Sequence, residues 1–149
     1  MMPKWHIFYG VIFSSLLYFV TGYTLIASLI VFLSSIFIDL DKVILFILKE
    51  KSLNFFEFWR QEILKRKLWE KRKNNTKFKH EIRFLHGIEV FIILLIFSII
   101  HEFFFFIFLG FFFHILLDVF DYVYHGEDFF NKLSIIYTMI TNKNKKKLD

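Results

Sequence analysis

The run FFFFIFLGFFFHILLDVF, from Phe103 to Phe120, decides the fold class of this chain. At about 1.5 Å of helical rise per residue it approaches the thickness of a bilayer's hydrocarbon core, and its only ionisable side chains are those of His114 and Asp118. Hydrophobic residues make up 56% of the 149 residues, above the roughly 45–50% that is typical of soluble chains. Because this excess is concentrated in uncharged runs, the sequence predicts helices that face lipid.

Four apolar runs predict four membrane spans within a single membrane domain, residues 1–149. The predicted spans cover approximately residues 5–22, 24–40, 84–100 and 103–121. The first two are short for a crossing that takes about 20 residues, so they fit either short spans or a tight hairpin. Connections at Thr21–Tyr23 and His101–Glu102 would join the spans into two helical hairpins. A cleaved signal peptide over residues 1–22 is disfavoured, because no small-residue cleavage pattern follows and a second apolar run begins at once.

The basic residues predict the orientation in the membrane. All 19 Lys and Arg residues lie before the first span, between the second and third, or after the fourth. The positive-inside rule therefore makes both termini and the central segment cytoplasmic, in an inner membrane. Residues 49–79 mix aromatic and basic side chains at helical spacing, which predicts an amphipathic helical insert on the inner leaflet, and residues 141–149 form a basic tail. We thus expect an all-α, polytopic bundle whose partner is the bilayer with its anionic headgroups, and we expect no nucleic acid.

Ionisable residues at the ends of the predicted spans form the candidate site. A charge at the centre of a membrane helix costs about 2.5–3.5 kcal/mol on insertion scales, so such residues require a reason. His114, Asp118 and Asp121 follow one another at helical spacing, which places them on one face. Because successive spans run in opposite directions, six candidate metal ligands fall at the cytoplasmic end: His6, Asp39, Asp41, His86, His114 and Asp118. At the opposite end lie only His101 and Glu102.

The residue types indicate the chemistry. The chain has no cysteine, so its ligands would be imidazole and carboxylate, a set that suits zinc first, with manganese or iron as alternatives. A divalent cation held there would lower the pKa of a bound water toward neutrality, which predicts hydrolysis of an ester or phosphoester, with a phospholipid as the natural substrate at this depth. We assign Glu89 a catalytic role in moving protons or orienting a ligand; a structural hydrogen bond to a neighbouring helix is the alternative.

Other interpretations remain open. His6 fits an interfacial side chain, and Asp39 with Asp41 fits a helix stop that faces solvent. Three residues are expected nearer water: His80, Asp121 and His125. The whole chain also fits a non-enzymatic metal or proton carrier, a haem-binding bundle that uses His86 and His114, or a structural membrane protein.

Four short motifs, in order along the chain, resemble those of a known family. They are His6 with Gly10, Ile38-Asp39-Leu40-Asp41, Phe84-Leu85-His86-Gly87, and His114 with Asp118. This pattern is similar to the membrane-bound metal-dependent hydrolase family, described as LexA-binding and inner-membrane-associated, and the resemblance implies that activity. The His-x-x-x-Asp element is also similar to one in zinc-dependent phospholipase C and related nucleases, which implies phosphoester hydrolysis. The chain departs from the family pattern at Ile38, where the family has Pro, and in lacking the Ser of the third motif.

Overall fold

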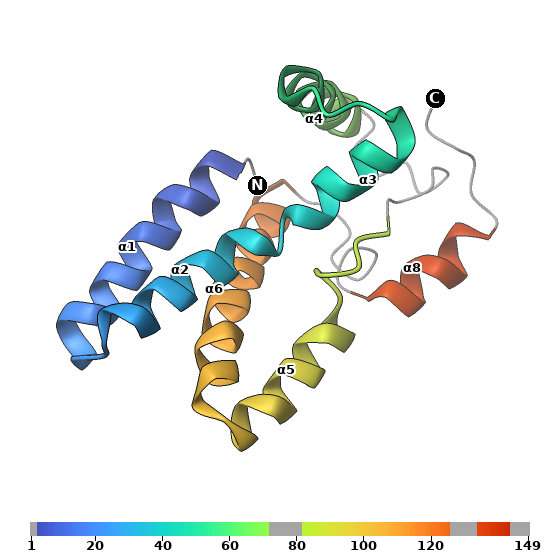
Figure 1. The fold of residues 1–149 in the computed structure, drawn as a ribbon. Helices are drawn as coiled ribbons and strands as arrows, with labels where there is room; N and C mark the ends of the chain where they lie inside the picture. Colours follow the sequence, from blue (N-terminus) through green and yellow to red (C-terminus); the bar gives the residue numbers. More distant parts are fainter. Residues whose placement is uncertain (1–2, 72–81, 126–133, 144–149) are drawn as a thin grey trace.

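The computed structural model describes residues 3–71, 82–125 and 134–143, and every regular element in these ranges is an α-helix (Figure 1). The helices are α1 (Pro3–Thr21), α2 (Leu25–Phe37), α3 (Leu40–Glu50), α4 (Phe55–Lys71), α5 (Ile88–Ile100), α6 (Glu102–His125) and α8 (Ile135–Asn142). The predicted all-α class is confirmed. The end of the predicted insert (72–79), His80 and most of the basic tail (144–149) lie outside the described residues.

Helices α1, α2, α5 and α6 form a bundle in which α2 contacts both α1 and α6, and α5 packs against α6. The chain reverses after α1 at Gly22, whose φ of 68° favours glycine. Thr24 then caps α2 by accepting a hydrogen bond from the Ala27 N–H at 3.2 Å. The second reversal is at His101, whose Nδ1 accepts a hydrogen bond from the Phe103 N–H at 3.0 Å. The structure therefore has both of the predicted hairpin connections.

Small residues allow α2 to approach its two neighbours closely. A Cβ atom at Gly110 of α6 would lie 2.4 Å from the backbone oxygen of Val31 and 1.9 Å from Ser34 Oγ. A Cβ atom at Gly10 of α1 would lie 2.9 Å from Ser35 Oγ. The buried core cluster consists of Ala27, Val31 and Phe106. Packing through small residues is typical of membrane helix bundles, and here it holds the second half of α2 between α1 and α6.

Two of the predicted spans are shorter than expected. The second, predicted over 24–40, ends with α2 at Phe37, and a break at Ile38–Asp39 leads into α3, which the sequence did not predict as a separate helix. The third, predicted from residue 84, begins at Ile88 because residues 82–87 form non-helical backbone. At both places, polar residues at the end of the bundle lie in backbone that is not helical. A membrane protein tolerates such backbone where other parts of the protein surround it.

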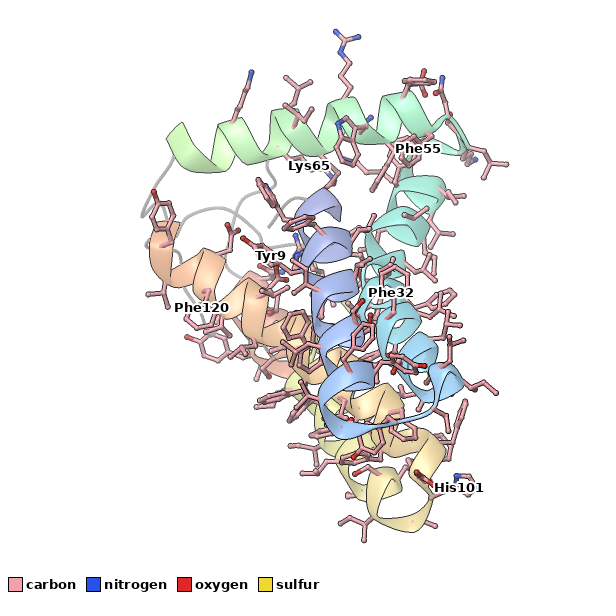
Figure 2. The ribbon with its side chains drawn as sticks, turned by 90° about the vertical axis from the view of Figure 1, so that its left-hand side faces the viewer. Tyr9, Phe32, Phe55, Lys65, His101 and Phe120 are labelled. Atoms are coloured by element: carbon pink, nitrogen blue, oxygen red, sulfur yellow. The ribbon has the colours of Figure 1, made fainter. Side chains whose placement is uncertain are left out.

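Helix α4 lies across the end of the bundle at which α1 begins, and His101 lies at the opposite end (Figure 2). The helix starts after Asn54, whose Oδ1 accepts a hydrogen bond from the Phe56 N–H at 3.0 Å. Phe58 is 6% exposed and packs edge-on against Phe46 of α3, with ring centroids 5.4 Å apart. The predicted helical insert is therefore present as α4, joined to α3 by an aromatic contact.

Helix α6 differs from the other described helices in length and apolar character. Among the described helices, α6 is the one long and apolar enough to cross a membrane, through Glu102–Asp121. Trp5–Thr21 and Ile88–Ile100 are apolar but shorter. Helix α2 has 13 residues, which at 1.5 Å each is about 20 Å. The finer prediction of a four-span bundle is therefore not established by helix length.

Candidate metal centre

The six predicted ligands are carried by different elements that meet at one end of the bundle. His6 lies in α1, Asp39 at the α2–α3 break, Asp41 in α3, His86 in the turn before α5, and His114 and Asp118 in α6. All of them except Asp39 are only 1–3% exposed. Two overlapping groups bring possible ligand atoms within 4.8 Å of one another: His6 with His114 and Asp118, and Asp39 with His86 and His114. The expectation that distant polar residues gather at one end therefore agrees with the geometry.

Two imidazole nitrogens and two carboxylate oxygens form the inner part of this cluster. His86 Nε2 lies 3.3 Å from Asp39 Oδ1 and 3.6 Å from Asp118 Oδ2. His114 Nε2 lies 3.7 Å from each of the same two oxygens. Ligand atoms on a tetrahedral zinc ion, with bonds of about 2.0–2.2 Å, are separated by about 3.3–3.6 Å. The four spacings between nitrogens and oxygens are therefore close to those around one such ion.

Hydrogen bonds behind the rings orient both histidines. His114 Nδ1 donates to the backbone oxygen of Ser35 at 2.6 Å. His86 Nδ1 lies 2.9 Å from Asp41 Oδ2, which also accepts a hydrogen bond from the Leu85 N–H at 3.3 Å. Because a carbonyl or carboxylate oxygen can only accept, each Nδ1 carries a proton, and in the neutral form of each ring Nε2 would face the inner cluster with its lone pair. Histidine metal ligands are commonly held in this way, so Asp41, predicted as a ligand, is placed where it would orient one.

His6 joins the cluster from the side of α1. Its ring stacks on the ring of His114, with centroids 4.0 Å apart and an interplanar angle of 11°. Its Nε2 lies 3.1 Å from Asp118 Oδ1, while the other oxygen of Asp118 faces His86 and His114. Asp118 therefore lies between all three imidazoles, and His6 is placed as a further ligand.

Lys42 is a member of this region that the sequence analysis missed. It is 7% exposed, and its Nζ forms an ion pair with Asp39 Oδ1, the oxygen that also faces His86 and His114. Burial alone would raise the pKa of Asp39, but the Lys42 ammonium and the two imidazoles hold that pKa well below its usual range. The feature of the sequence that could have identified Lys42 is its position, one helical turn after the predicted ligand Asp39.

Glu89, predicted to be catalytic, is placed at the start of α8. Its Oε1 accepts hydrogen bonds from Ser134 Oγ at 2.7 Å and from the Ile136 N–H at 3.3 Å, and its Oε2 accepts one from the Ile135 N–H at 3.3 Å. A carboxylate at a helix N-terminus is a favourable cap. This is the structural hydrogen bond that the sequence left as the alternative, and the catalytic role of Glu89 stays a prediction.

The residues that converge come from four motifs widely separated along the chain. Three imidazoles and two carboxylates are directed at one buried region, and hydrogen bonds behind two of the rings set the direction of their lone pairs. Sulfur ligands are excluded, because the chain has no cysteine. Comparison of the chain with protein-family models, with curated proteins and with solved structures found no match.

Proposed function

We propose that this protein is a metal-dependent hydrolase that acts on an ester or phosphoester at the cytoplasmic face of a membrane. One observation carries the proposal. The Nε2 atoms of His86 and His114 are buried, make no hydrogen bond within the described residues, and lie 3.3–3.7 Å from carboxylate oxygens of Asp39 and Asp118. Buried polar atoms without a hydrogen bond are rare in proteins and indicate an unseen partner.

A network of ion pairs without a metal would explain these distances less well. If His86 and His114 were doubly protonated, their Nε2–H groups would donate to the facing carboxylates at about 2.7–2.9 Å, as charge-assisted hydrogen bonds do. The separations from the Asp118 oxygen are instead 3.6 and 3.7 Å. A neutral Nε2 and a carboxylate oxygen at this separation have the spacing of two ligands of one cation.

The donor set supports zinc first. His86, His114, Asp39 and Asp118 supply nitrogen and oxygen donors, and His6, whose Nε2 lies 3.1 Å from the second oxygen of Asp118, offers one more nitrogen. Manganese and iron also accept imidazole and carboxylate ligands, so they remain alternatives. When bound, a divalent cation would supply Lewis-acid activation of water and of the substrate's carbonyl or phosphoryl oxygen.

The protein's own residues would position and balance this centre. Asp41 and the Ser35 carbonyl keep a proton on Nδ1 of His86 and His114, so that both rings offer Nε2 to the ion. Lys42 pairs with Asp39 Oδ1, the oxygen that also faces the imidazoles, and balances its negative charge. The burial of the cluster strengthens these electrostatic interactions, because water screens them poorly there.

A site at the membrane surface is supported by the distribution of charge and apolar surface. Helix α6 is long and apolar enough to cross a bilayer, and α5 has no buried residue although it is built almost entirely from apolar side chains. Phe19, at the end of α1, and Ile99, at the end of α5, are 80% and 82% exposed. Lipid would cover such surface. The cluster of ligands then lies at the end of the bundle that the basic residues assign to the cytoplasm.

A metal or proton carrier is less well supported, because transport needs polar groups along the whole path. The buried core of the bundle contains Ala27, Val31 and Phe106, and the buried polar residues beside it in α2 are uncharged serines. We therefore favour an enzyme over a carrier.

The experiment that tests this proposal is metal analysis of the purified full-length protein. We expect about one equivalent of zinc per chain, and we expect its loss in the double variant His114→Ala plus Asp118→Ala. The double variant His101→Ala plus Glu102→Ala removes the same kinds of side chain at the opposite end and serves as the matched control. Zinc-dependent hydrolysis of a p-nitrophenyl ester and of bis-p-nitrophenyl phosphate, abolished by EDTA, would then identify the bond cleaved. Equal metal content in both double variants would reject the centre.

A further inference from the structure

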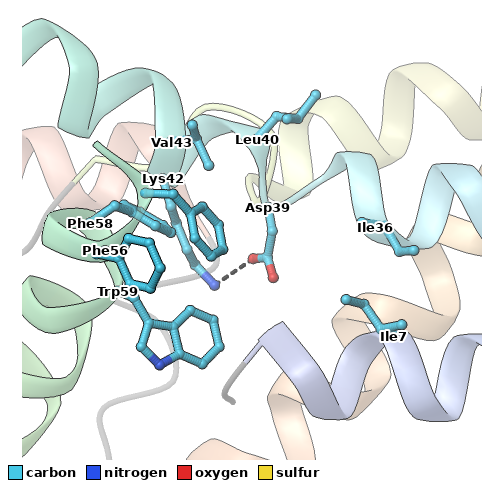
Figure 3. Close-up of a pocket in the computed structure, with 10 residues that line it drawn as sticks. Ile7, Ile36, Asp39, Leu40, Lys42, Val43, Phe56, Phe58 and Trp59 are labelled. Atoms are coloured by element: carbon cyan, nitrogen blue, oxygen red, sulfur yellow. Dashed lines mark ion pairs between the residues drawn. The ribbon is translucent and has the colours of Figure 1, made fainter. Parts of the chain in front are cut away.

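A pocket of about 550 Å³ opens beside the candidate metal centre (Figure 3). Its walls come from the first turns of α1, the α2–α3 junction and the first turns of α4, and nearly all of the lining side chains are apolar. Its volume falls within the range of about 300–1,000 Å³ that is usual for sites that hold one small molecule. Asp39 belongs both to this pocket and to the inner cluster of ligands, so the pocket adjoins the centre at this residue.

The pocket has two charged side chains among otherwise apolar ones. Asp39 and Lys42 supply its charged groups, and Lys42 is 7% exposed. Phe55 and Phe56 of α4, by contrast, are 66% and 84% exposed and line the same pocket. The two charged groups therefore lie toward the buried side of the pocket, where Phe58 also packs, and Phe55 and Phe56 lie on its open side. A molecule that matches this arrangement has a polar head that enters first and an apolar chain that extends outward.

We propose, building on the hydrolase function above, that this pocket binds the substrate and that the substrate is a long-chain amphiphile with an anionic phosphoester head group. The Lys42 ammonium supplies a buried positive charge where the head group would lie, and lysine is a common binder of phosphate. Val43, Phe56 and Trp59 supply the apolar surface for the chain. A water-soluble phosphoester without a chain would leave this surface uncovered, and a neutral apolar molecule would make no use of the Lys42 ammonium, which pairs with Asp39 in this structure.

The test uses photo-crosslinking, which reports binding without turnover. The probe is a dodecyl phosphodiester with a diazirine at the end of its chain, added to full-length protein in nanodiscs of zwitterionic lipid, with EDTA present throughout. We expect crosslinks on α4, mapped by mass spectrometry, that excess dodecyl phosphodiester removes and that inorganic phosphate leaves in place. That difference separates a chain-bearing ligand from free phosphate.

Variants locate the binding to the pocket. Phe56→Ala should lower the apparent affinity of the probe by about fivefold to thirtyfold, as a loss of about 1–2 kcal/mol of apolar contact would. Leu53→Ala is the matched control, because Leu53 is 85% exposed, close to the 84% of Phe56, and does not line the pocket. Val43→Trp should block the pocket, whereas Ile44→Trp, at the next position and outside the pocket, should not. Since Phe56 is exposed, its truncation keeps the test informative even if Val43→Trp fails to fold.

Lys42 tests the charge of the head group. Lys42→Gln should lower the affinity for the phosphodiester probe more than the affinity for a probe with a neutral head group. Lys42→Arg should restore most of the lost affinity for the phosphodiester probe. The proposal would be overturned if Phe56→Ala and Leu53→Ala changed the crosslinks equally. It would also be overturned if inorganic phosphate removed the crosslinks. Specific crosslinking in a protein that binds no zinc would support the pocket and reject the hydrolase function. Zinc-dependent hydrolysis with no specific crosslinking would support the hydrolase function and reject the pocket as the substrate site.

Discussion

The imidazole rings of His6 and His114 stack with their centroids 4.0 Å apart and their planes 11° from parallel. One ring belongs to the start of α1 and the other to the second half of α6, so this contact joins the first and last helices of the bundle. It also places His6 Nε2 at 3.1 Å from Asp118 Oδ1. The stacking therefore adds a third imidazole to the pair that faces Asp39 and Asp118.

Asp41→Asn should weaken zinc binding and keep its stoichiometry. Asp41 Oδ2 lies 2.9 Å from His86 Nδ1, so the change removes the charge that orients the ring and leaves the ligand set in place. Loss of such a partner typically lowers metal affinity by about 10–100-fold. Competition with a chromogenic chelator would measure the dissociation constant. Glu57→Gln, a change of the same kind at an exposed carboxylate that binds Ser52, is the control; loss of all bound zinc would show instead that Asp41 is a ligand.

Glu89→Ala should loosen α8 without removing bound metal. The variant deletes the acceptor of three hydrogen bonds from residues 134–136, and the loss of a helix cap costs about 1 kcal/mol. Hydrogen exchange of the α8 amides should therefore be about fivefold faster. Ser134→Ala should have a similar effect on exchange, because the Ser134 hydroxyl accepts from the Tyr137 N–H. A loss of hydrolysis in Glu89→Ala that Ser134→Ala does not share would support the predicted catalytic role.

Gly110→Ala should destabilise the bundle more than Gly10→Ala. At Gly110 a Cβ would lie 2.4 Å from the backbone oxygen of Val31, whereas at Gly10 the nearest atom is the Ser35 hydroxyl at 2.9 Å. A hydroxyl can rotate but a backbone oxygen cannot, so we expect a cost of about 1–3 kcal/mol at Gly110 and less at Gly10. Thermal unfolding in detergent would measure both. Equal melting temperatures for Gly110→Ala and the unchanged protein would contradict the close packing of α2 and α6.

Single cysteines should be labelled from opposite sides of the membrane. The chain has no cysteine of its own, so His101→Cys and Leu53→Cys each provide a unique thiol. In intact cells, a membrane-impermeant maleimide should label His101→Cys, which the proposed topology puts outside. Leu53, at the 85% exposed turn before α4, should react only after the cells are permeabilised. Labelling of both from the same side would reject the proposed topology and the cytoplasmic site with it.

Much of the site could be predicted because it depends on helix direction alone. Once the hairpin connections at Gly22 and His101 are assigned, the start of one helix and the end of the next must lie at the same end of the bundle. This holds whatever the exact first residue of each helix is. This argument placed His6, His86 and His114 together, and in the structure His114 contacts both of the other rings. It could not separate Asp39 from Asp41, because their roles depend on the break at the end of α2.

By itself, the sequence determined the all-α class, the two hairpins and the end of the bundle at which the ionisable residues gather, because apolar runs and their breaks are local properties of the chain. Only the tertiary structure decided which carboxylate faces the centre and which lies behind His86, that Glu89 caps α8, and that buried Lys42 joins the site to an apolar pocket. These roles depend on ring orientation and on contacts between elements far apart in the chain. Periodicity along the chain carries no information about either.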